Sequence, residues 1–315
     1  MLGSHDGYRH LIEATRGADP VPTAVCHPCS APAIVAAAEA AEAGLIAPVL
    51  VGPDARIEAA AEEAGVDISA FRIVSAPHSH AAAQAAVDLV RSGDVQALMK
   101  GSLHTDELMG AVVSHASGLR TERRISHVYL MDVPGHARPI LITDAAINIA
   151  PTLEEKADII RNAIDLAHVI GIDAPKVAIL SAVETVNPAI PSTLDAAALC
   201  KMADRGQIVG GVLDGPLAFD NAISAVAAKE KGIVSPVAGQ AEILVVPNLE
   251  AGNMLAKQLT FLGNADAAGI VLGARVPIIL TSRADSVRTR LASCAVAVLM
   301  ARAATKAAPG MPVAA

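Results

Sequence analysis

Short apolar segments alternate with longer amphipathic segments along most of this 315-residue chain. The apolar segments are too short to be helices, whereas the longer ones are rich in alanine and several end at a glycine. Such strand–helix alternation is typical of a parallel sheet that is covered on both faces, so the pattern predicts an α/β fold. The predicted strands are residues 23–27, 48–52, 71–74, 96–99, 176–180, 208–213, 243–246 and 276–280, with 125–133 and 139–143 as an antiparallel hairpin.

The pattern restarts after residue 143, where we place a boundary between two α/β lobes. Beyond it, Thr152 and Glu155 form a capping box that opens a helix to about Ile170. A long apolar helix is expected over residues 284–304, and it returns the chain to the first lobe. We therefore expect residues 1–143 and 277–315 to form the first domain and residues 144–276 to form the second.

Composition narrows the class of protein. Hydrophobic residues make up 53 % of the chain, but no apolar run reaches the roughly 18 to 20 residues of a membrane-spanning helix. The first residues include His5, Asp6, Arg9 and Glu13 and do not resemble a signal peptide, so we expect a cytoplasmic protein without a membrane partner. A net charge of −8 argues against a nucleic-acid partner, because general nucleic-acid binders have a basic face.

The four cysteines do not form a strong motif. Cys26-His27-Pro28-Cys29 has the spacing of half a zinc or redox site, but no second pair follows it. Cys200 and Cys294 lie in helical patterns. We therefore expect reduced, mostly buried thiols and no metal site.

The turn after the predicted strand 276–280 is the first candidate for a ligand site. It places Ser282, Arg283 and Asp285 at the carboxyl end of a strand and beside the start of a helix, where open α/β sheets bind ligands. A guanidinium close to backbone N–H groups suits a phosphate. On local sequence alone, a capped helix with Arg283 in solvent explains the turn equally well.

Other strand ends also carry polar residues. Residues 100–106 bring a lysine, a glycine, hydroxyls and a histidine to the end of one predicted strand, without the glycine spacing of a P-loop. Three arginines within residues 120–124 form the strongest local positive charge of an acidic chain and could meet an anion. Asp214-Gly215-Pro216, which precedes a predicted helix to Lys231, has the composition of an ordinary turn.

Several motifs occur in register between about residue 20 and about residue 303. They are Lys100-Gly101 through His104-Thr105, Ser126-His127 with Pro134-Gly135, Asp144 through Asn148 with Pro151, Asp214-Gly215-Pro216-Leu217 with Asp220, Gly252-Asn253, and Thr281-Ser282-Arg283. Each motif alone is unspecific. The whole set resembles the phosphate acetyltransferase and phosphate butyryltransferase family.

The resemblance implies a fold and a reaction. The expected fold has two α/β lobes of three-layer αβα architecture, similar to isocitrate and isopropylmalate dehydrogenases, with the second lobe inserted into the first and the active site in the cleft between them. The expected reaction is reversible acyl transfer between coenzyme A and inorganic phosphate. It implies acyl-CoA as a substrate, no permanently bound cofactor or metal, no covalent acyl-enzyme, and a homodimer. We expect acetyl as the acyl group and keep butyryl as the alternative.

The resemblance also implies residue roles. The family's closing motif falls on Ser282 and Arg283, and a second family arginine falls on Arg124. The aspartate that acts on the CoA thiol in the acetyltransferases falls on Thr289, so the nearest carboxylate is Asp285, a pattern closer to the butyryltransferases.

We therefore expect Arg283 and Arg124 to bind phosphate and Asp285 to take the thiol proton. Ser282 would hold the oxyanion or the thioester sulfur. The residues expected to line the substrate site are Lys100, Gly101, His104, Thr105, Asp220, Gly252 and Asn253.

Other classes of protein stay open at this point. A two-lobed NAD-dependent dehydrogenase is disfavoured, because no Gly-x-Gly-x-x-Gly follows a strand and no aspartate cluster suits a divalent metal. A catalytically silent ligand-binding module is compatible with Thr289 in place of the aspartate. Cys29 would permit a ping-pong route through an acyl thioester on the protein, which alkylation by iodoacetamide tests.

Overall fold

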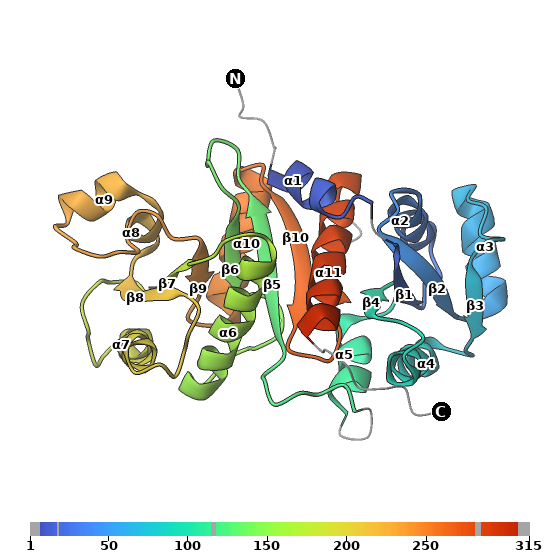
Figure 1. Ribbon diagram of the computed structural model, residues 1–315, viewed down its shortest axis with the longest axis horizontal. Helices are drawn as coiled ribbons and strands as arrows, with labels where there is room; N and C mark the ends of the chain where they lie inside the picture. The colour runs from blue at the N-terminus through green and yellow to red at the C-terminus, as the bar shows by residue number, and fades with distance from the viewer. Residues whose placement is uncertain (1–6, 18, 115–117, 281–284, 308–315) are drawn as a thin grey trace. The chain divides into compact units, whose positions relative to one another are not determined.

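The computed structural model describes residues 7–17, 19–114, 118–280 and 285–307 (Figure 1). It divides into two compact units. Among the described residues, the outer unit consists of residues 8–123 and 268–307, and the inserted unit consists of residues 124–267 together with Gly7.

The bounds of these units differ from those of the two domains that the sequence pattern predicts. The strands β5 (Ser126–Asp132) and β6 (Ile140–Thr143) form the predicted antiparallel hairpin, but β6 also pairs in parallel with β9 (Ile243–Val245), so the hairpin belongs to the inserted unit. Most of β10 (Asp266–Leu272) belongs to the outer unit, where it pairs antiparallel with β11 (Ile278–Ile279). The role of the two lobes as separate domains stays a prediction.

The outer unit is a sheet in the order β3-β2-β1-β4-β11-β10, with helices on both faces. All neighbours from β3 to β11 are parallel, and only β10 runs antiparallel to its partner. The elements not yet given are α1 (Gly7–Ala14), β1 (Val21–Cys26), α2 (Ala31–Glu42), β2 (Ile46–Gly52), α3 (Asp54–Ala64), β3 (Arg72–Ser75), α4 (Ser79–Ser92), β4 (Ala97–Lys100), α5 (Thr105–Val113) and α11 (Val287–Ala307).

The strand order reverses between β1 and β4. From β1 the chain moves through β2 to β3 on one side, whereas β4 pairs with the other side of β1. Helices α2 and α4 lie on opposite sides of these two strands (Figure 1). In open α/β sheets such a reversal leaves a crevice at the carboxyl ends of the two strands, and here those ends are Cys26 and Lys100.

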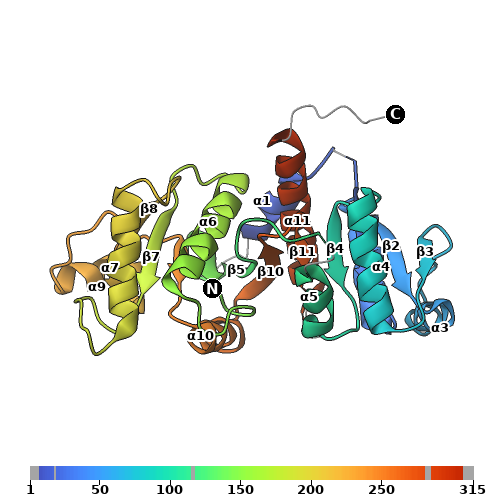
Figure 2. The ribbon, with the colours of Figure 1, turned by 90° about the horizontal axis from the view of Figure 1, so that it is seen from below.

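In the inserted unit, the strands of the sheet lie in the order β5-β6-β9-β7-β8. Only the β5–β6 pair is antiparallel. Figures 1 and 2 show α6 and α10 on opposite faces of this sheet. The remaining elements are α6 (Leu153–Val169), β7 (Lys176–Leu180), α7 (Pro191–Asp204), β8 (Val212–Leu217), α8 (Phe219–Ile223), α9 (Ala225–Glu230) and α10 (Leu249–Leu262).

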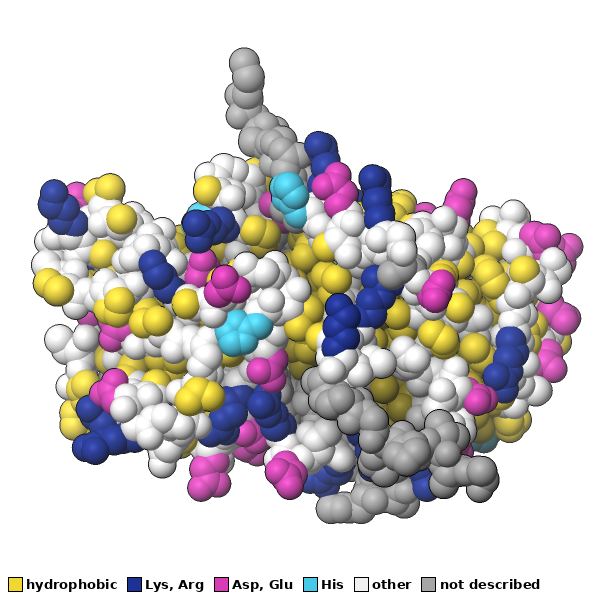
Figure 3. Space-filling view, in the orientation of Figure 1, with side chains coloured by type: hydrophobic (Ala, Val, Ile, Leu, Met, Phe, Trp, Pro, Cys, Tyr) yellow, Lys and Arg dark blue, Asp and Glu magenta, His cyan; other side chains and the backbone are white. Residues whose placement is uncertain are grey.

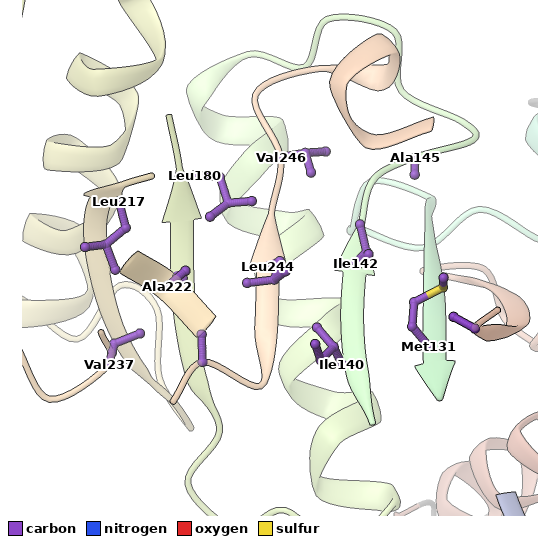
Figure 4. Packing of buried hydrophobic residues seen from close by; sticks show 13 residues of the cluster. Met131, Ile140, Ile142, Ala145, Leu180, Leu217, Ala222, Val237, Leu244 and Val246 are labelled. Atoms are coloured by element: carbon purple, nitrogen blue, oxygen red, sulfur yellow. The ribbon is translucent and has the colours of Figure 1, made fainter. Parts of the chain in front are cut away.

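A core of aliphatic side chains fixes one face of this sheet. Ile140, Ile142 and Leu244 point to the same side, where they belong to one cluster with Ala222 of α8 (Figure 4). Leu255 of α10 packs against this cluster. Because successive side chains of a strand point to opposite faces, the residues between them face α6, which contacts the same strands. The two buried faces explain the nearly continuous apolar runs that predicted the strands.

Two predicted elements of this unit are wrong in place or extent. The strand predicted at residues 208–213 begins later, at Val212, because Gly210 has a left-handed backbone with φ of 89°, which interrupts an extended run. As a result, Asp214-Gly215-Pro216 lies within β8 rather than in a turn. The helix predicted to reach Lys231 is two short helices, because the extended Ser224 ends α8 and caps α9.

The hydrophobicity of the helices and the charge of the surface bear on whether the chain has a membrane or a nucleic-acid partner. Among the described residues, no helix combines the length and the hydrophobicity needed to cross a bilayer. On the face shown in Figure 3, lysine and arginine side chains are interspersed with aspartate and glutamate. On this face, an anionic ligand would therefore be bound by locally placed arginines and lysines rather than by a broad basic field.

Candidate active site

In the outer unit, the turn after β4 packs closely against the turn after β1. The backbone N–H of Gly101 donates to the Cys26 carbonyl at 2.9 Å, and that of Ser102 donates to the His27 carbonyl at 2.9 Å. A Cβ at Gly101 would lie 2.8 Å from the His27 carbonyl oxygen and closer still to that of Cys26. Glycine is therefore required here by the close approach of two backbones.

The predicted residues around Gly101 lie at this turn. Lys100 folds its ammonium back onto the carbonyls of Gly101 and Leu103, each at 3.3 Å. His104 precedes the first residue of α5, Thr105, and its backbone N–H donates to Glu107 at 3.3 Å. The His104 side chain is exposed. These contacts bring the four predicted residues together, and their role in substrate binding stays a prediction.

His27 lies in the same turn and was not predicted as a site residue. Its backbone is left-handed, with φ of 53°, and its side chain is buried. Neither ring nitrogen has a hydrogen-bond partner among the described residues. Burial, with a contribution from nearby Arg56, lowers its pKa, so the ring is neutral at pH 7. Nothing in the sequence distinguishes a buried from an exposed histidine at this position.

The cysteines are not arranged as a metal site among the described residues, in which no group of three or more His, Cys, Asp or Glu side chains could hold an ion. All four thiols are free. Burial raises the pKa of Cys26, Cys200 and Cys294 to about 12 and raises that of the half-buried Cys29 as well. A raised pKa weakens a thiol as a nucleophile at neutral pH.

In the inserted unit, the turn after β6 is organised by one buried carboxylate. Asp144 accepts hydrogen bonds from the backbone N–H groups of His127, Ala146, Ile147 and Asn148 at 2.9–3.3 Å. It also accepts one from the Asn148 side chain at 2.6 Å. Five donors on one carboxylate fix this turn, which we name the Asp144 turn (residues 144–148).

His127 lies beside the Asp144 turn, on β5. Its ring is fully buried and contacts the Tyr129 ring edge-on, with 4.3 Å between the centroids. Burial lowers the pKa of His127 to about 4, although the charge of Asp144 acts in the opposite direction. The ring is therefore neutral at physiological pH.

Arg124 reaches the Asp144 turn from the segment before β5. Its Nε donates to Asn148 Oδ1 at 2.7 Å, and its Nη1 pairs with Glu155 Oε1 at 2.9 Å. Half of the side-chain surface remains exposed. A guanidinium that is held on one side and exposed on the other can still bind an anion.

Asn162 fixes the backbone of the same segment. From α6 its amide donates to the Arg124 carbonyl at 2.8 Å and to Ser126 Oγ at 2.9 Å. Neither Asn148 nor Asn162 was predicted as a site residue. The signal for Asn162 is a polar residue on the buried stripe of α6, beside Ile159 and Ala163.

Three further predicted residues lie in the inserted unit. Gly252 is buried on α10, where a Cβ would meet Val246 and Ala145, and Asn253 donates to the Ala145 carbonyl at 3.2 Å. Both therefore adjoin the Asp144 turn. Asp220 lies in the first turn of α8 and is exposed, and none of the described contacts joins it to that turn.

The predicted closing motif is only partly described. Ser282 and Arg283 lie outside the described residues. Asp285 precedes α11 and accepts a 2.7 Å hydrogen bond on its backbone carbonyl from Arg290. Thr289, at which the family resemblance places the acetyltransferase aspartate, is buried in the first turn of α11, and its backbone N–H donates to Ser286 Oγ. The roles of Ser282, Arg283 and Asp285 stay predictions.

Comparisons of the sequence and of the structure with known proteins each match members of one family of acyltransferases. A model of the phosphate acetyl/butaryl transferase family matches residues 78–298. A phosphate acetyltransferase of Rhizobium meliloti is 66 % identical over 294 residues, which are 93 % of each chain. A phosphate butyryltransferase of Clostridium acetobutylicum is 44 % identical and covers 86 % of this chain and 90 % of its own. The crystal structure of a branched-chain phosphotransacylase from Enterococcus faecalis superposes with a TM-score of 0.78 at 30 % identity, over 89 % of this chain and 99 % of that one.

Proposed function

The chain belongs to the phosphate acetyl/butaryl transferase family, and from that premise we propose that it transfers an acetyl group reversibly between coenzyme A and inorganic phosphate. The observation that carries the proposal is its high identity to a phosphate acetyltransferase over nearly the full length of both chains. Coenzyme A enters as a substrate rather than as a permanently bound cofactor.

The chemistry defines what the site must do. A phosphate oxygen attacks the thioester carbonyl, a C–O bond forms, the C–S bond breaks, and the coenzyme A thiolate leaves and takes up a proton. We assign Arg283 and Arg124 to the phosphate and Asp285 to the proton of the thiol. Ser282 would stabilise the oxyanion or hold the sulfur, a contribution of roughly 3–4 kcal/mol for one well-placed donor.

Arg124 has the clearest structural support among these residues. Its guanidinium is anchored at Nε and Nη1, and its side chain is half exposed, so it can receive an anion without first being ordered. Preorganised donors lose less conformational entropy when they bind. Lys100, Gly101, His104 and Thr105 of the outer unit, and Gly252 and Asn253 of the inserted unit, are our further candidates for substrate contacts.

Butyryl transfer is the second candidate for the acyl group. The relative with 44 % identity is named a phosphate butyryltransferase, and the family resemblance places the aspartate of the acetyltransferases at Thr289 of this chain. We favour acetyl because the relative named as an acetyltransferase is much more similar.

We also propose a homodimer. The helix α10 exposes Met254, Phe261 and Leu262, which are 65 %, 72 % and 78 % exposed, and large apolar side chains gathered on one helix favour association. Size-exclusion chromatography with light scattering measures the mass and decides between one chain and two. The cytoplasmic location expected from the sequence stays a prediction.

One assay tests the proposed reaction. The purified protein is mixed with acetyl-CoA or butyryl-CoA and phosphate, without added metal or nicotinamide, and free thiol is followed. We expect phosphate-dependent thiol release, faster with acetyl-CoA. Absence of thiol release with both thioesters, or a requirement for NAD, would contradict the proposal.

Two variants test the assigned residue roles. Replacement of Arg283 by alanine should raise the KM for phosphate. An Asp285→Asn variant with an unchanged pH–rate profile would show that Asp285 is not the base.

A further inference from the structure

A buried asparagine connects Arg124 to the Asp144 turn. Asn148 is 2 % exposed, its Oδ1 accepts from Arg124 Nε at 2.7 Å, and its Nδ2 donates to Asp144 Oδ2 at 2.6 Å. The same Nδ2 donates to the Ile125 carbonyl at 2.9 Å. These three hydrogen bonds join the amide to the segment before β5, through Arg124 and Ile125, and to Asp144.

The partners determine which way the amide faces. The Ile125 carbonyl can only accept a hydrogen bond, and the oxygens of Asp144 act as acceptors in all five of its described hydrogen bonds. Nδ2 must therefore face these two acceptors, and Oδ1 must face Arg124. The reverse orientation would bring an amide oxygen against two acceptors and an NH₂ group against a guanidinium.

This contact fixes the guanidinium without cancelling its charge. Asn148 is a neutral acceptor, whereas the pair with Glu155 reduces the positive potential at Nη1. No hydrogen bond to Nη2 is present among the described residues. With Nε directed into the protein, Nη2 remains for an external anion, and rotation of the plane of the group is restricted.

We propose that Asn148 is a positioning residue for the acyl-transfer reaction: held by Asp144, it orients Arg124 to bind the oxyanion of phosphate or of the acyl phosphate. This inference rests on the proposed function, because the substrate supplies the anion. In this role Asn148 acts through Arg124 and does not itself contact the substrate. The role also explains why Asp144 is buried, since Asp144 holds Asn148 in place.

The test compares two buried polar side chains of the inserted unit. Asn148→Ala removes the acceptor of the guanidinium, whereas Thr193→Ala removes a buried hydroxyl of α7 that bonds to Asn187 and has no described contact with Arg124. We expect Asn148→Ala to raise the KM for phosphate about tenfold, the loss expected for one charge-assisted hydrogen bond. The kcat and the KM for acetyl-CoA should stay within about twofold, as should all constants of Thr193→Ala.

A double variant separates positioning from a general loss of structure. In the Arg124→Ala background, Asn148→Ala should raise the phosphate KM no further, because the group that it orients is gone. If Asn148→Ala fails to fold, Asn148→Ser serves instead, since the shorter hydroxyl can remain near Asp144 but cannot reach the guanidinium. Circular dichroism and thermal unfolding check that each variant is folded.

The outcomes distinguish this inference from the proposed function. If the unmodified protein releases thiol in a phosphate-dependent way and Arg124→Ala raises the phosphate KM, an unchanged phosphate KM in Asn148→Ala overturns the positioning role alone. Additive effects in the double variant overturn it as well. An unmodified protein without phosphate-dependent release overturns the proposed function, and the inference with it.

Discussion

Two turns at the carboxyl ends of strands are stabilised in opposite ways. In the Asp144 turn after β6, one buried carboxylate accepts five hydrogen bonds. In the turn after β1, the buried His27 ring has no hydrogen-bond partner in the part of the chain that the structure describes, and backbone hydrogen bonds hold the segment instead. His27 donates its N–H to the Val51 carbonyl at 2.7 Å, and its own carbonyl accepts from Ser102.

The difference shows where each turn is sensitive to substitution. A turn built on one carboxylate depends on that side chain, because its loss leaves several buried N–H groups without an acceptor. A turn built on close backbone contact depends on the residue that permits the approach, which here is Gly101. Both turns adjoin predicted substrate residues. Side-chain contacts fix the polar segment in one turn, and backbone contacts fix it in the other.

The largest effect should come from removing the carboxylate. We expect Asp144→Ala to lower the free energy of unfolding by about 4 kcal/mol, because it leaves five donors without an acceptor in a buried site. Urea denaturation measures the change. The matched control is Asp204→Ala, an aspartate whose side chain is 61 % exposed and which should tolerate the change. Equal effects of the two substitutions would contradict the central role of the carboxylate.

A second, smaller effect should appear with pH, at the histidine beside the Asp144 turn. The pKa of His127 is about 4 in the folded protein and close to 6.5 when unfolded, so the unfolded chain takes up a proton that the folded one does not. Stability should therefore fall by up to about 3 kcal/mol as pH decreases from 6.5 to 4 and should not change from this source above pH 7.

Denaturation at several pH values isolates this contribution. Other carboxylates also titrate in the range, so the quantity to follow is the difference in unfolding free energy between the unmodified protein and His127→Leu. As the pH falls, the unfolding free energy of the unmodified protein should decrease relative to that of His127→Leu. A difference that is constant from pH 7 to pH 4 would show that His127 does not carry the effect.

The smallest of the three effects concerns the turn after β4. Gly101→Ala should destabilise the protein by about 2 kcal/mol, because the added Cβ collides with two carbonyl oxygens of the neighbouring turn. Gly110→Ala is the control, since no atom lies within 4 Å of its added Cβ and α5 gains helix propensity. If both variants are equally stable, the two backbones are not in the close contact described.

Sequence patterns predicted much of the fold, because most elements carry their own signals. The strand β7 has the predicted bounds, and α6 begins at the predicted capping box. The exceptions are elements that depend on distant partners. The strand β8 contains a glycine and a proline that are typical of turns, and it is extended because it pairs with β7. The strand β10 was not predicted at all, although it pairs with β11.

The candidate site was less predictable for the same reason. The local charge and the family resemblance made Arg124 a candidate, but its hydrogen-bond partner Asn148 is 24 positions further along the chain. The contact exists only because β5 and β6 pair and bring the segment before β5 to the turn after β6. No periodicity or composition contains that information.

The strand β11 has a consequence for the order in which the chain can be completed during synthesis. It lies between β4 and β10, so the sheet of the outer unit stays open at the edge of β4 until residue 279 has emerged from the ribosome. All strands of the inserted unit have been made by then. A nascent chain that stalls before this point would expose the β4 edge, where another chain could pair with it.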